Sequence, residues 1–228
     1  MEESSRFHPS PGKIPNHAGI IPDGGRRWAS VHGCSLRESY LRTRSQLQSM
    51  VELLSGKGVK EISLYLSSIQ NFRREEDEMA AGLELVESSL AHEIPELAGR
   101  RGLRVTVAGN REIIPASLLE KVNTIEQSTC DHKKGRLNLL LAYDPLDEIM
   151  QAMNKPGSSG RFWDHLSVTT PVDLIIRTGD APLLSNFLPL QSGYARLFFF
   201  ERLFNDLTPE DILGVLEQFS TIERKFGN

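Results

Sequence analysis

The stretch His17-Ala-Gly-Ile-Ile-Pro22, followed by Asp23-Gly-Gly-Arg-Arg-Trp28, decides the fold of this chain. Its first half is a short apolar run typical of a β-strand, and its second half is a glycine turn at the start of a helix. Glycines let the backbone approach an anion closely, free N–H groups at a helix start point at it, and arginines neutralise it. Asp23 is well placed to hold Mg²⁺ against phosphate oxygens. The alternative is a plain helix N-terminus with two solvated arginines.

The remainder of the chain alternates apolar runs of strand length with segments of helical periodicity. This alternation predicts a single α/β domain with a central, mostly parallel six-stranded sheet flanked by helices. Ligands then belong at the carboxyl ends of the strands. The run at 197–200 is expected to be a strand, with Phe198-Phe-Phe200 buried near a dimer interface. Further strands are expected at 61–66, 103–108, 136–142 and 172–177, and helices at 41–54, 75–97, 115–127, 146–153 and 209–226.

Composition excludes several classes of protein. The chain has 228 residues and a net charge of −4, so its overall charge gives no hint of a nucleic acid or an anionic membrane as partner. Its two cysteines favour a reducing compartment, and no apolar run reaches the roughly 18 residues of a membrane span. We expect a cytoplasmic protein with a flexible N-terminal arm over 1–16, a catalytic domain over 17–228 and a flexible loop at 155–160.

Two more loops at the same predicted sheet edge suit anions. Ser67-Ser-Ile-Gln-Asn-Phe-Arg-Arg74 supplies hydroxyls, an amide and arginines, although it could simply cap the next helix. Arg177 directly follows a predicted buried strand, where an unpaired charge is costly. Its partner is therefore an anion, or else a carboxylate such as Asp180 or Glu201. Three anion-suited loops at one edge point to a ligand with more than one phosphate group.

Three sequence blocks resemble the cis-prenyltransferases, the undecaprenyl diphosphate synthase family, over about residues 14–227. The family signatures are H-x-A-I-I-x-D-G-N-x-R-W-A, L-Y-A-F-S-x-E-N-W-x-R-P-x-x-E and a third block with an R-T-G turn. The blocks here are His17-Ala-Gly-Ile-Ile-Pro-Asp-Gly-Gly-Arg-Arg-Trp-Ala29, Leu64-Tyr-Leu-Ser-Ser-Ile-Gln-Asn-Phe-Arg-Arg-Glu-Glu-Asp-Glu78, and Asp173-Leu-Ile-Ile-Arg-Thr-Gly179 with Leu184-Ser-Asn-Phe-Leu-Pro-Leu-Gln-Ser-Gly-Tyr-Ala195.

The resemblance implies a homodimer with the cis-prenyltransferase fold and a Mg²⁺-dependent reaction between two prenyl diphosphates, which releases diphosphate. Asp23 looks like the metal-binding, catalytically needed aspartate. The other catalytic candidates are Arg27, Ser68 and Asn71. The candidates for substrate binding are Gly24, Gly25, Arg26, Arg37, Tyr40, Leu66, Phe72, Arg74, Arg177, Ser185 and Arg196.

Departures from the family pattern concentrate on the side that normally takes isopentenyl diphosphate. This chain has Gly25 where the family has an asparagine and Tyr40 where the family usually has a histidine. It has Leu183 in place of an arginine and Arg196 in place of a glutamate. Because small repositioning changes which carbon attacks, we hypothesise head-to-middle coupling of two dimethylallyl diphosphates. The product would be a lavandulyl- or cyclolavandulyl-type C10 diphosphate, a pattern similar to the cyclolavandulyl branch of the family. The second diphosphate would be held by Arg177 and Arg196.

Two other functions stay open at the level of sequence. The chain could be a regular short-chain enzyme that adds isopentenyl diphosphate, as the retained Asp23, Arg27 and Arg177 would allow. It could also be a non-catalytic partner subunit, although such a subunit would be expected to lose the metal aspartate and the glycine–arginine turn. A generic nucleotide-binding domain is disfavoured because the chain carries no Walker or dinucleotide fingerprint.

Overall fold

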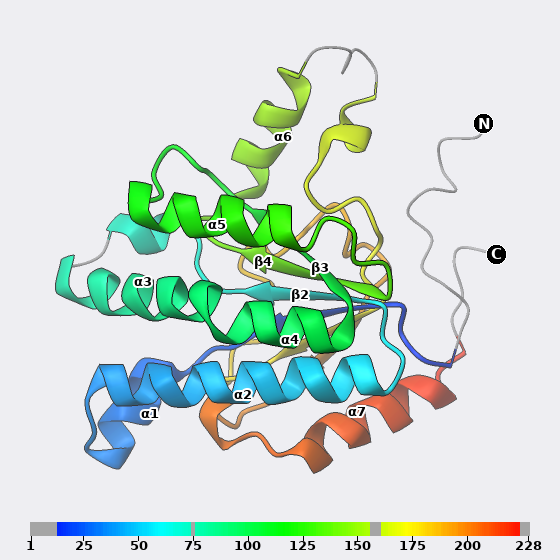
Figure 1. The fold of residues 1–228 in the computed structure, drawn as a ribbon. Helices are drawn as coiled ribbons and strands as arrows, with labels where there is room; N and C mark the ends of the chain where they lie inside the picture. The colour runs from blue at the N-terminus through cyan, green and yellow to red at the C-terminus, as the bar shows by residue number, and fades with distance from the viewer. Residues whose placement is uncertain (1–12, 74–75, 156–160, 224–228) are drawn as a thin grey trace.

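A six-stranded, fully parallel sheet forms the centre of the molecule (Figure 1). The computed structural model describes residues 13–73, 76–155 and 161–223. The strand order is β3-β4-β2-β1-β5-β6, so β1 lies between β2 and β5. The predicted α/β fold is confirmed. The strands are β1 (His17–Ile21), β2 (Glu61–Tyr65), β3 (Leu103–Ala108), β4 (Gly135–Leu140), β5 (Leu174–Arg177) and β6 (Arg196–Phe199).

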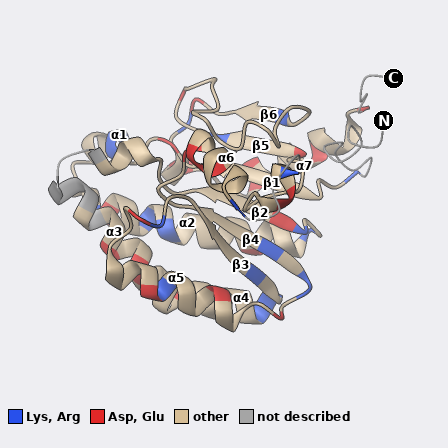
Figure 2. Cartoon of the chain, turned by 90° about the horizontal axis from the view of Figure 1, so that it is seen from above, with Lys and Arg blue, Asp and Glu red and all other residues tan. Residues whose placement is uncertain are grey.

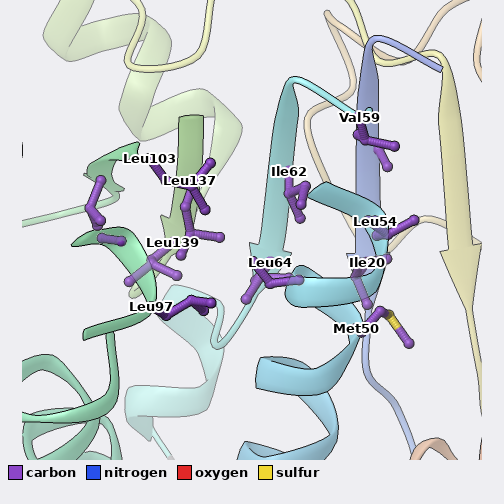
Figure 3. Close-up of a cluster of buried hydrophobic side chains, with 14 of the residues drawn as sticks. Ile20, Met50, Leu54, Val59, Ile62, Leu64, Leu97, Leu103, Leu137 and Leu139 are labelled. Carbon is purple, nitrogen blue, oxygen red and sulfur yellow. The ribbon is translucent and has the colours of Figure 1, made fainter. Parts of the chain in front are cut away.

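Helices cover one face of this sheet and bury its main core. Figure 3 shows Ile20, Ile62 and Leu64 of the strands near Met50 and Leu54 of α2. Alternate residues of each strand face this layer, as the two-residue period of a strand requires. The helices that bury this core are α2 (Leu36–Gly56), α3 (Glu76–Ala91), α4 (Glu93–Arg101), α5 (Ala116–Ser128) and α7 (Pro209–Thr221). The other two helices, α1 (Gly25–His32) and α6 (Pro145–Met153), contribute no residue to it.

A second, smaller core lies on the opposite face of the sheet. Ile21, Ile175 and Leu140 point to this side and pack with Phe187 and Leu188 from the segment that follows β5. The segment after β5 is therefore held against the sheet by apolar packing, which fixes the end of the third predicted anion-binding loop.

Helix α2 is held firmly at its first turns. Ser35 caps it, and Ser35 and Glu38 form a reciprocal capping box. Further along, the fully buried Asn205 donates from Nδ2 to the Ser39 carbonyl and accepts from the Thr43 hydroxyl at 2.7 Å. These hydrogen bonds fix the first turns of α2, which lie near the carboxyl ends of the strands.

The single helix predicted over 75–97 is wrong, because the structure contains two helices with a break at His92. Pro95 explains the break. Proline has no N–H and its ring clashes with the carbonyl four residues earlier, so it is tolerated only in the first turn of a helix. Pro95 occupies the third position of α4, within that first turn.

The strand predicted at 197–200 is present as β6, but it is not fully buried within one chain, and its burial near a dimer interface stays a prediction. β6 is the last strand of the sheet, and Leu197 and Phe199 are 44% and 40% exposed. An edge strand has a neighbour on one side only, which leaves apolar side chains open. The terminal helix ends at Thr221, not at 226, and the predicted loop at 155–160 falls almost entirely outside the described residues.

Residues of both charge signs are interspersed over the helices and strands (Figure 2), in keeping with the small net charge. Within the described residues, no helix has the length and apolar character needed to cross a lipid bilayer.

A buried polar network links the amino ends of the central strands. The His17 ring is fully buried, with Nδ1 3.1 Å from the Thr170 carbonyl oxygen and Nε2 2.7 Å from the Ser63 hydroxyl. Asn138 donates to the same Ser63 oxygen and to Glu61. These partners suit a neutral ring that donates from Nδ1 and accepts at Nε2. Burial lowers the pKa of His17 below its usual value.

We predict that acid destabilises the fold through His17. Because the folded pKa is depressed, the unfolded chain binds the proton first as pH falls below about 6.5, so the free energy of unfolding decreases by at most about 1.4 kcal/mol per pH unit. His17→Gln should flatten this part of the profile, measured by urea unfolding between pH 8 and pH 5. The exposed His32→Gln is the control. Identical profiles for His17→Gln and wild type would contradict the assignment.

Candidate active site

An ion pair between Asp23 and Arg177 lies at the carboxyl edge of the sheet. In the parallel pairing of β1 and β5, Ile21 lies beside Arg177, which brings the residue after β1 next to the end of β5. The Arg177 Nη2 atom donates to Asp23 Oδ2 at 2.9 Å, and the Arg177 side chain is only 7% exposed. The partner of Arg177 is therefore Asp23, and neither Asp180 nor Glu201.

Arg177 also organises the loop that follows it. Its Nη1 atom donates to the Leu183 carbonyl and to the Ser185 hydroxyl, each at 2.7 Å. Ser185 and Asn186 have positive φ angles of 49° and 64°, which cost energy in residues other than glycine. The Arg177 Nε atom is buried and has no hydrogen-bond partner within the described residues. A buried cationic donor with one free N–H suits an additional anionic ligand.

Thr178 and Gly179 fix the backbone of Asp23. The Thr178 hydroxyl accepts from the Asp23 N–H at 3.0 Å and donates to the Asp23 carbonyl at 2.8 Å. The Gly179 carbonyl accepts from Arg27 Nη2 at 2.7 Å. A Cβ on Gly179 would come within 2.6 Å of that Arg27 nitrogen, and its φ of +83° also favours glycine. The backbone of Asp23, which follows β1, is thus held in place by residues that follow β5.

The glycine turn begins α1 as the sequence predicted. Gly24 is the N-cap residue with φ of 113°, a conformation that L side chains rarely adopt. α1 has no acidic residue in its first turn and no side chain caps it. The first turn of α1 lines the cavity beside Asp23, and the start of a helix at that position suits a phosphate group.

The loop after β2 closes another side of the site. The Asn71 Oδ1 atom accepts from the Ser68 N–H at 2.7 Å and from the Ser68 hydroxyl at 3.0 Å. This turn holds both polar side chains at the cavity, where Phe72 also lies. Arg74, which the sequence assigned to this loop, lies outside the described residues.

Tyr65, at the end of β2, joins this loop to the third one. Its hydroxyl donates to the Ser185 carbonyl at 2.9 Å, and burial raises its pKa to about 12. The phenol therefore remains a hydrogen-bond donor throughout the physiological pH range. Tyr65 also forms an edge contact with Phe187, with ring centroids 5.7 Å apart.

Two of the residues that differ from the family pattern, Gly25 and Tyr40, lie side by side. A Cβ on Gly25 would lie 3.4 Å from Cε1 of Tyr40, and a Cβ on Gly82 would lie 3.7 Å from the other side of that ring. The Tyr40 ring thus fits between two glycines. The small residue at position 25 and the large residue at position 40 therefore shape the same part of the cavity wall, and both differ from the family pattern.

These loops surround the mouth of a cavity of about 1030 Å³, at the top of the usual range for small-molecule sites. Its mouth is polar and its interior, between the sheet, α2, α3 and α4, is mostly apolar. The predicted residues that line it are Asp23, Gly24, Gly25, Arg26, Arg27, Tyr40, Leu66, Ser68, Asn71, Phe72, Arg177 and Ser185.

Two predicted residues lie elsewhere. Arg37 is exposed on α2 and pairs with Glu84 at 3.4 Å. Arg196 begins β6 and lies beside Leu174, at the opposite end of the strands from Arg177, where its Nη2 approaches the Glu223 carbonyl at 3.4 Å. Within one chain, Arg196 and Arg177 therefore do not share a ligand.

Sequence reasoning missed three residues that shape the site: Tyr65, Thr178 and Gly179. All three fall inside the sequence blocks quoted above, so a signal was present. Their roles depend on contacts with residues more than 100 positions away along the chain, and those contacts follow from the strand order.

The donor set at the mouth fits a Mg²⁺–diphosphate complex. No cluster of three or more acidic, His or Cys side chains that could hold a metal occurs within the described residues. Among the residues that the structure describes, Asp23 alone presents a carboxylate beside arginines at the cavity mouth, with 36% of its side chain exposed. Mg²⁺ is usually bound by one or two carboxylates, with substrate phosphates and water completing its shell. A single aspartate is therefore sufficient.

Known proteins are similar to this chain in both sequence and fold. The family model described as putative undecaprenyl diphosphate synthase matches residues 21–227. An isoprenyl transferase of Thermotoga maritima is 32% identical, with 94% of this chain and 97% of that protein covered. A tritrans,polycis-undecaprenyl-diphosphate synthase (geranylgeranyl-diphosphate specific) of Pyrococcus horikoshii is 29% identical, with 95% and 88% covered.

Two solved structures are also similar. Lavandulyl diphosphate synthase from Lavandula x intermedia, in complex with dimethylallyl diphosphate, superimposes with a TM-score of 0.87 at 25% identity, covering 95% of this chain and 99% of that one. A probable undecaprenyl diphosphate synthase of Campylobacter jejuni gives a TM-score of 0.79 at 26% identity, with 93% and 98% covered. The chain therefore belongs to the undecaprenyl diphosphate synthase family and is a prenyltransferase that synthesises a prenyl diphosphate.

Proposed function

We propose that this enzyme couples two molecules of dimethylallyl diphosphate head to middle and forms a lavandulyl- or cyclolavandulyl-type C10 diphosphate. The observation that carries the proposal is the contact between Gly25 and Tyr40, because it changes the wall beside the reacting groups. The similarity to a lavandulyl diphosphate synthase bound to dimethylallyl diphosphate supports the same substrate.

The first dimethylallyl diphosphate would bind at the start of α1. Its diphosphate would accept from N–H groups at the start of the helix and pair with Arg26 and Arg27, which line the mouth. Asp23 would hold Mg²⁺, which supplies charge neutralisation for the leaving diphosphate. The arginines stabilise the negative charge that develops as the C–O bond breaks. The hydrocarbon would extend into the apolar interior.

The second dimethylallyl diphosphate would bind on the side of Arg177. The free Nε–H of that arginine, the Ser185 hydroxyl and the Ser68–Asn71 turn offer donors to its diphosphate. The electron pair of its internal double bond would form the new C–C bond with the allylic cation. A tertiary cation results and loses one proton, directly or after ring closure. The released diphosphate, held close by the arginines, is a suitable base.

A regular enzyme that adds isopentenyl diphosphate is the second candidate. Relatives between 29% and 32% identical are named isoprenyl transferases or undecaprenyl diphosphate synthases. The residues at the mouth that bind the allylic diphosphate would serve either reaction. The difference between the two candidates therefore depends on the donor side, where Gly25, Tyr40 and Leu183 differ from the family pattern.

We also propose a homodimer. The edge strand β6 presents Leu197 and Phe199, and α6 presents Leu146, Met150 and Met153, which are 60–70% exposed. Apolar side chains on an edge strand and along one helix face are commonly covered by another chain. A second copy is the partner that the family resemblance suggests.

Incubation of the purified protein with Mg²⁺ and dimethylallyl diphosphate alone tests the proposal. We expect a branched or cyclic C10 alcohol after dephosphorylation, identified by gas chromatography–mass spectrometry. A linear cis product that forms only when isopentenyl diphosphate is added would replace the proposal with regular elongation.

The Gly25–Tyr40 contact predicts coupled effects of substitution. Gly25→Asn alone should lower C10 formation about tenfold, because the new side chain crowds the Tyr40 ring. Gly25→Asn/Tyr40→His should relieve the crowding and gain product from isopentenyl diphosphate, measured by product ratios. Gly33→Asn is a matched control, since no atom lies within 4 Å of a Cβ built there and asparagine tolerates its left-handed conformation. Additive effects of the two substitutions would contradict the coupling.

The two members of the central ion pair should have separable roles. Asp23→Asn should lower kcat by about 100-fold or more, because the metal ligand at the leaving group is lost. Arg177→Gln should chiefly raise the KM of the second substrate, measured by initial rates over a range of dimethylallyl diphosphate. Arg104→Gln, exposed on β3, is the control. Equal kcat losses in both variants without a change in KM would argue against two sites.

A further inference from the structure

The interior of the cavity contains an ion pair that the proposed reaction does not use. Arg44 of α2 and Glu93 of α4 both line the cavity, and Arg44 Nη1 lies 3.1 Å from Glu93 Oε1. Their side chains are 27% and 30% exposed. Their neighbours on the wall are mostly apolar, among them Leu47, Ile94 and Leu97, although Gln48 and Ser89 also line the cavity. A charged pair in such a wall is unusual because charges are costly to remove from water.

The position of the pair along the cavity follows from the topology. α2 connects the carboxyl end of β1, through α1, to the amino end of the parallel strand β2, so α2 runs antiparallel to the strands. Tyr40 lies at the mouth, and Arg44 is one helical turn, about 6 Å, further in. Val51, two turns beyond Arg44, also lines the cavity. The apolar space therefore continues past the backbone position of Arg44.

Partial exposure makes the pair sensitive to what lies beside it. The side chains of Arg44 and Glu93 are 27% and 30% exposed, so the cavity reaches part of the pair, although Glu93 Oε2 itself is buried and has no hydrogen-bond partner within the described residues. Charged groups that border a cavity are hydrated where water reaches them. A hydrocarbon chain that passed this point would displace that water from the charged pair, at a free-energy cost. A short chain that stops before the pair would leave the water in place.

We propose that the Arg44–Glu93 pair limits the length of the hydrocarbon that the cavity accepts, and so selects a C5 over a C15 allylic diphosphate. This inference rests on the proposed function, since it assigns the allylic chain to this cavity. It explains how a cavity of about 1030 Å³, roomy for a ten-carbon product, can still discriminate in favour of short substrates. Arg44 and Glu93 act here as specificity-determining residues and take no part in bond making.

The alternative is that the pair only ties α2 to α4. The molecule offers a matched control for that role, because Arg100 of α4 and Glu52 of α2 form a 2.6 Å ion pair between the same two helices. Neither residue lines this cavity. Loss of the Arg100–Glu52 pair should therefore affect stability without changing substrate length.

The test uses Arg44→Met/Glu93→Met, which removes both charges together and keeps unbranched side chains of adaptable shape. Calorimetry with Mg²⁺ would measure the affinities for unreactive thio-diphosphate analogues of the C5 and C15 allylic diphosphates. We expect the wild type to favour the C5 analogue, and the double variant to shift the C15-to-C5 affinity ratio by about tenfold toward C15. Glu52→Met/Arg100→Met should keep the wild-type ratio.

An unchanged ratio in the Arg44→Met/Glu93→Met variant, or a wild type that already prefers the C15 analogue, would overturn the inference. If that variant does not fold, judged by circular dichroism, Arg44→Gln/Glu93→Gln serves in its place with a smaller expected shift in the same direction. Because the analogues do not react, the affinity ratio is independent of which coupling occurs. A failure of the proposed C10 chemistry would appear in the product analysis and leave this ratio intact.

Discussion

The ion pair between Asp23 and Arg177 is the constraint on which the site depends. It forms because β1 and β5 are neighbours in a parallel sheet, so the residue after one strand meets the last residue of the other. Thr178 and Gly179 then fix the Asp23 backbone and the Arg27 side chain from the β5 side. A carboxylate suited to Mg²⁺ and a cation suited to a second diphosphate are thereby in direct contact, and in the proposed reaction this contact would set the two substrate molecules side by side.

Polar and apolar functions are separated along the cavity. The mouth presents helix N–H groups, arginines, hydroxyls and a single exposed carboxylate, all suited to diphosphate and Mg²⁺. The interior is formed by the apolar face of the sheet and by α2, α3 and α4. The wall between them contains Tyr40, which fits against Gly25 and Gly82. In the proposed reaction, small changes in this wall would alter the approach of one substrate to the other without altering the anchoring of either diphosphate.

Much of the fold could be predicted because its signals are local. Alternating apolar runs and glycine turns identified all six strands, and the turn after β1 was correctly placed at the start of α1. The break at His92 was missed although Pro95 signalled it, because the apolar period continues across the break. The exposure of Phe199 could not be predicted, since edge position depends on strand order.

The site was predictable where a motif and a strand end coincide. Asp23, Ser68 and Arg177 were all found this way, and all line the cavity. The position of Arg196 could not be predicted in this way. Its sequence position suggested a role beside Arg177, but the register pairs it with Leu174, at the far end of the strand. Long-range partners such as Thr178 for Asp23 depend on register as well.

The central claim is that one chain binds two dimethylallyl diphosphates, one on each side of the Asp23–Arg177 pair. Calorimetric titration with the unreactive thio-diphosphate analogue of dimethylallyl diphosphate, in the presence of Mg²⁺, measures this directly. The account predicts two molecules of analogue bound per chain, and one in Arg177→Gln. A wild-type stoichiometry of one, with a second site that fills only when isopentenyl diphosphate is supplied, would contradict it.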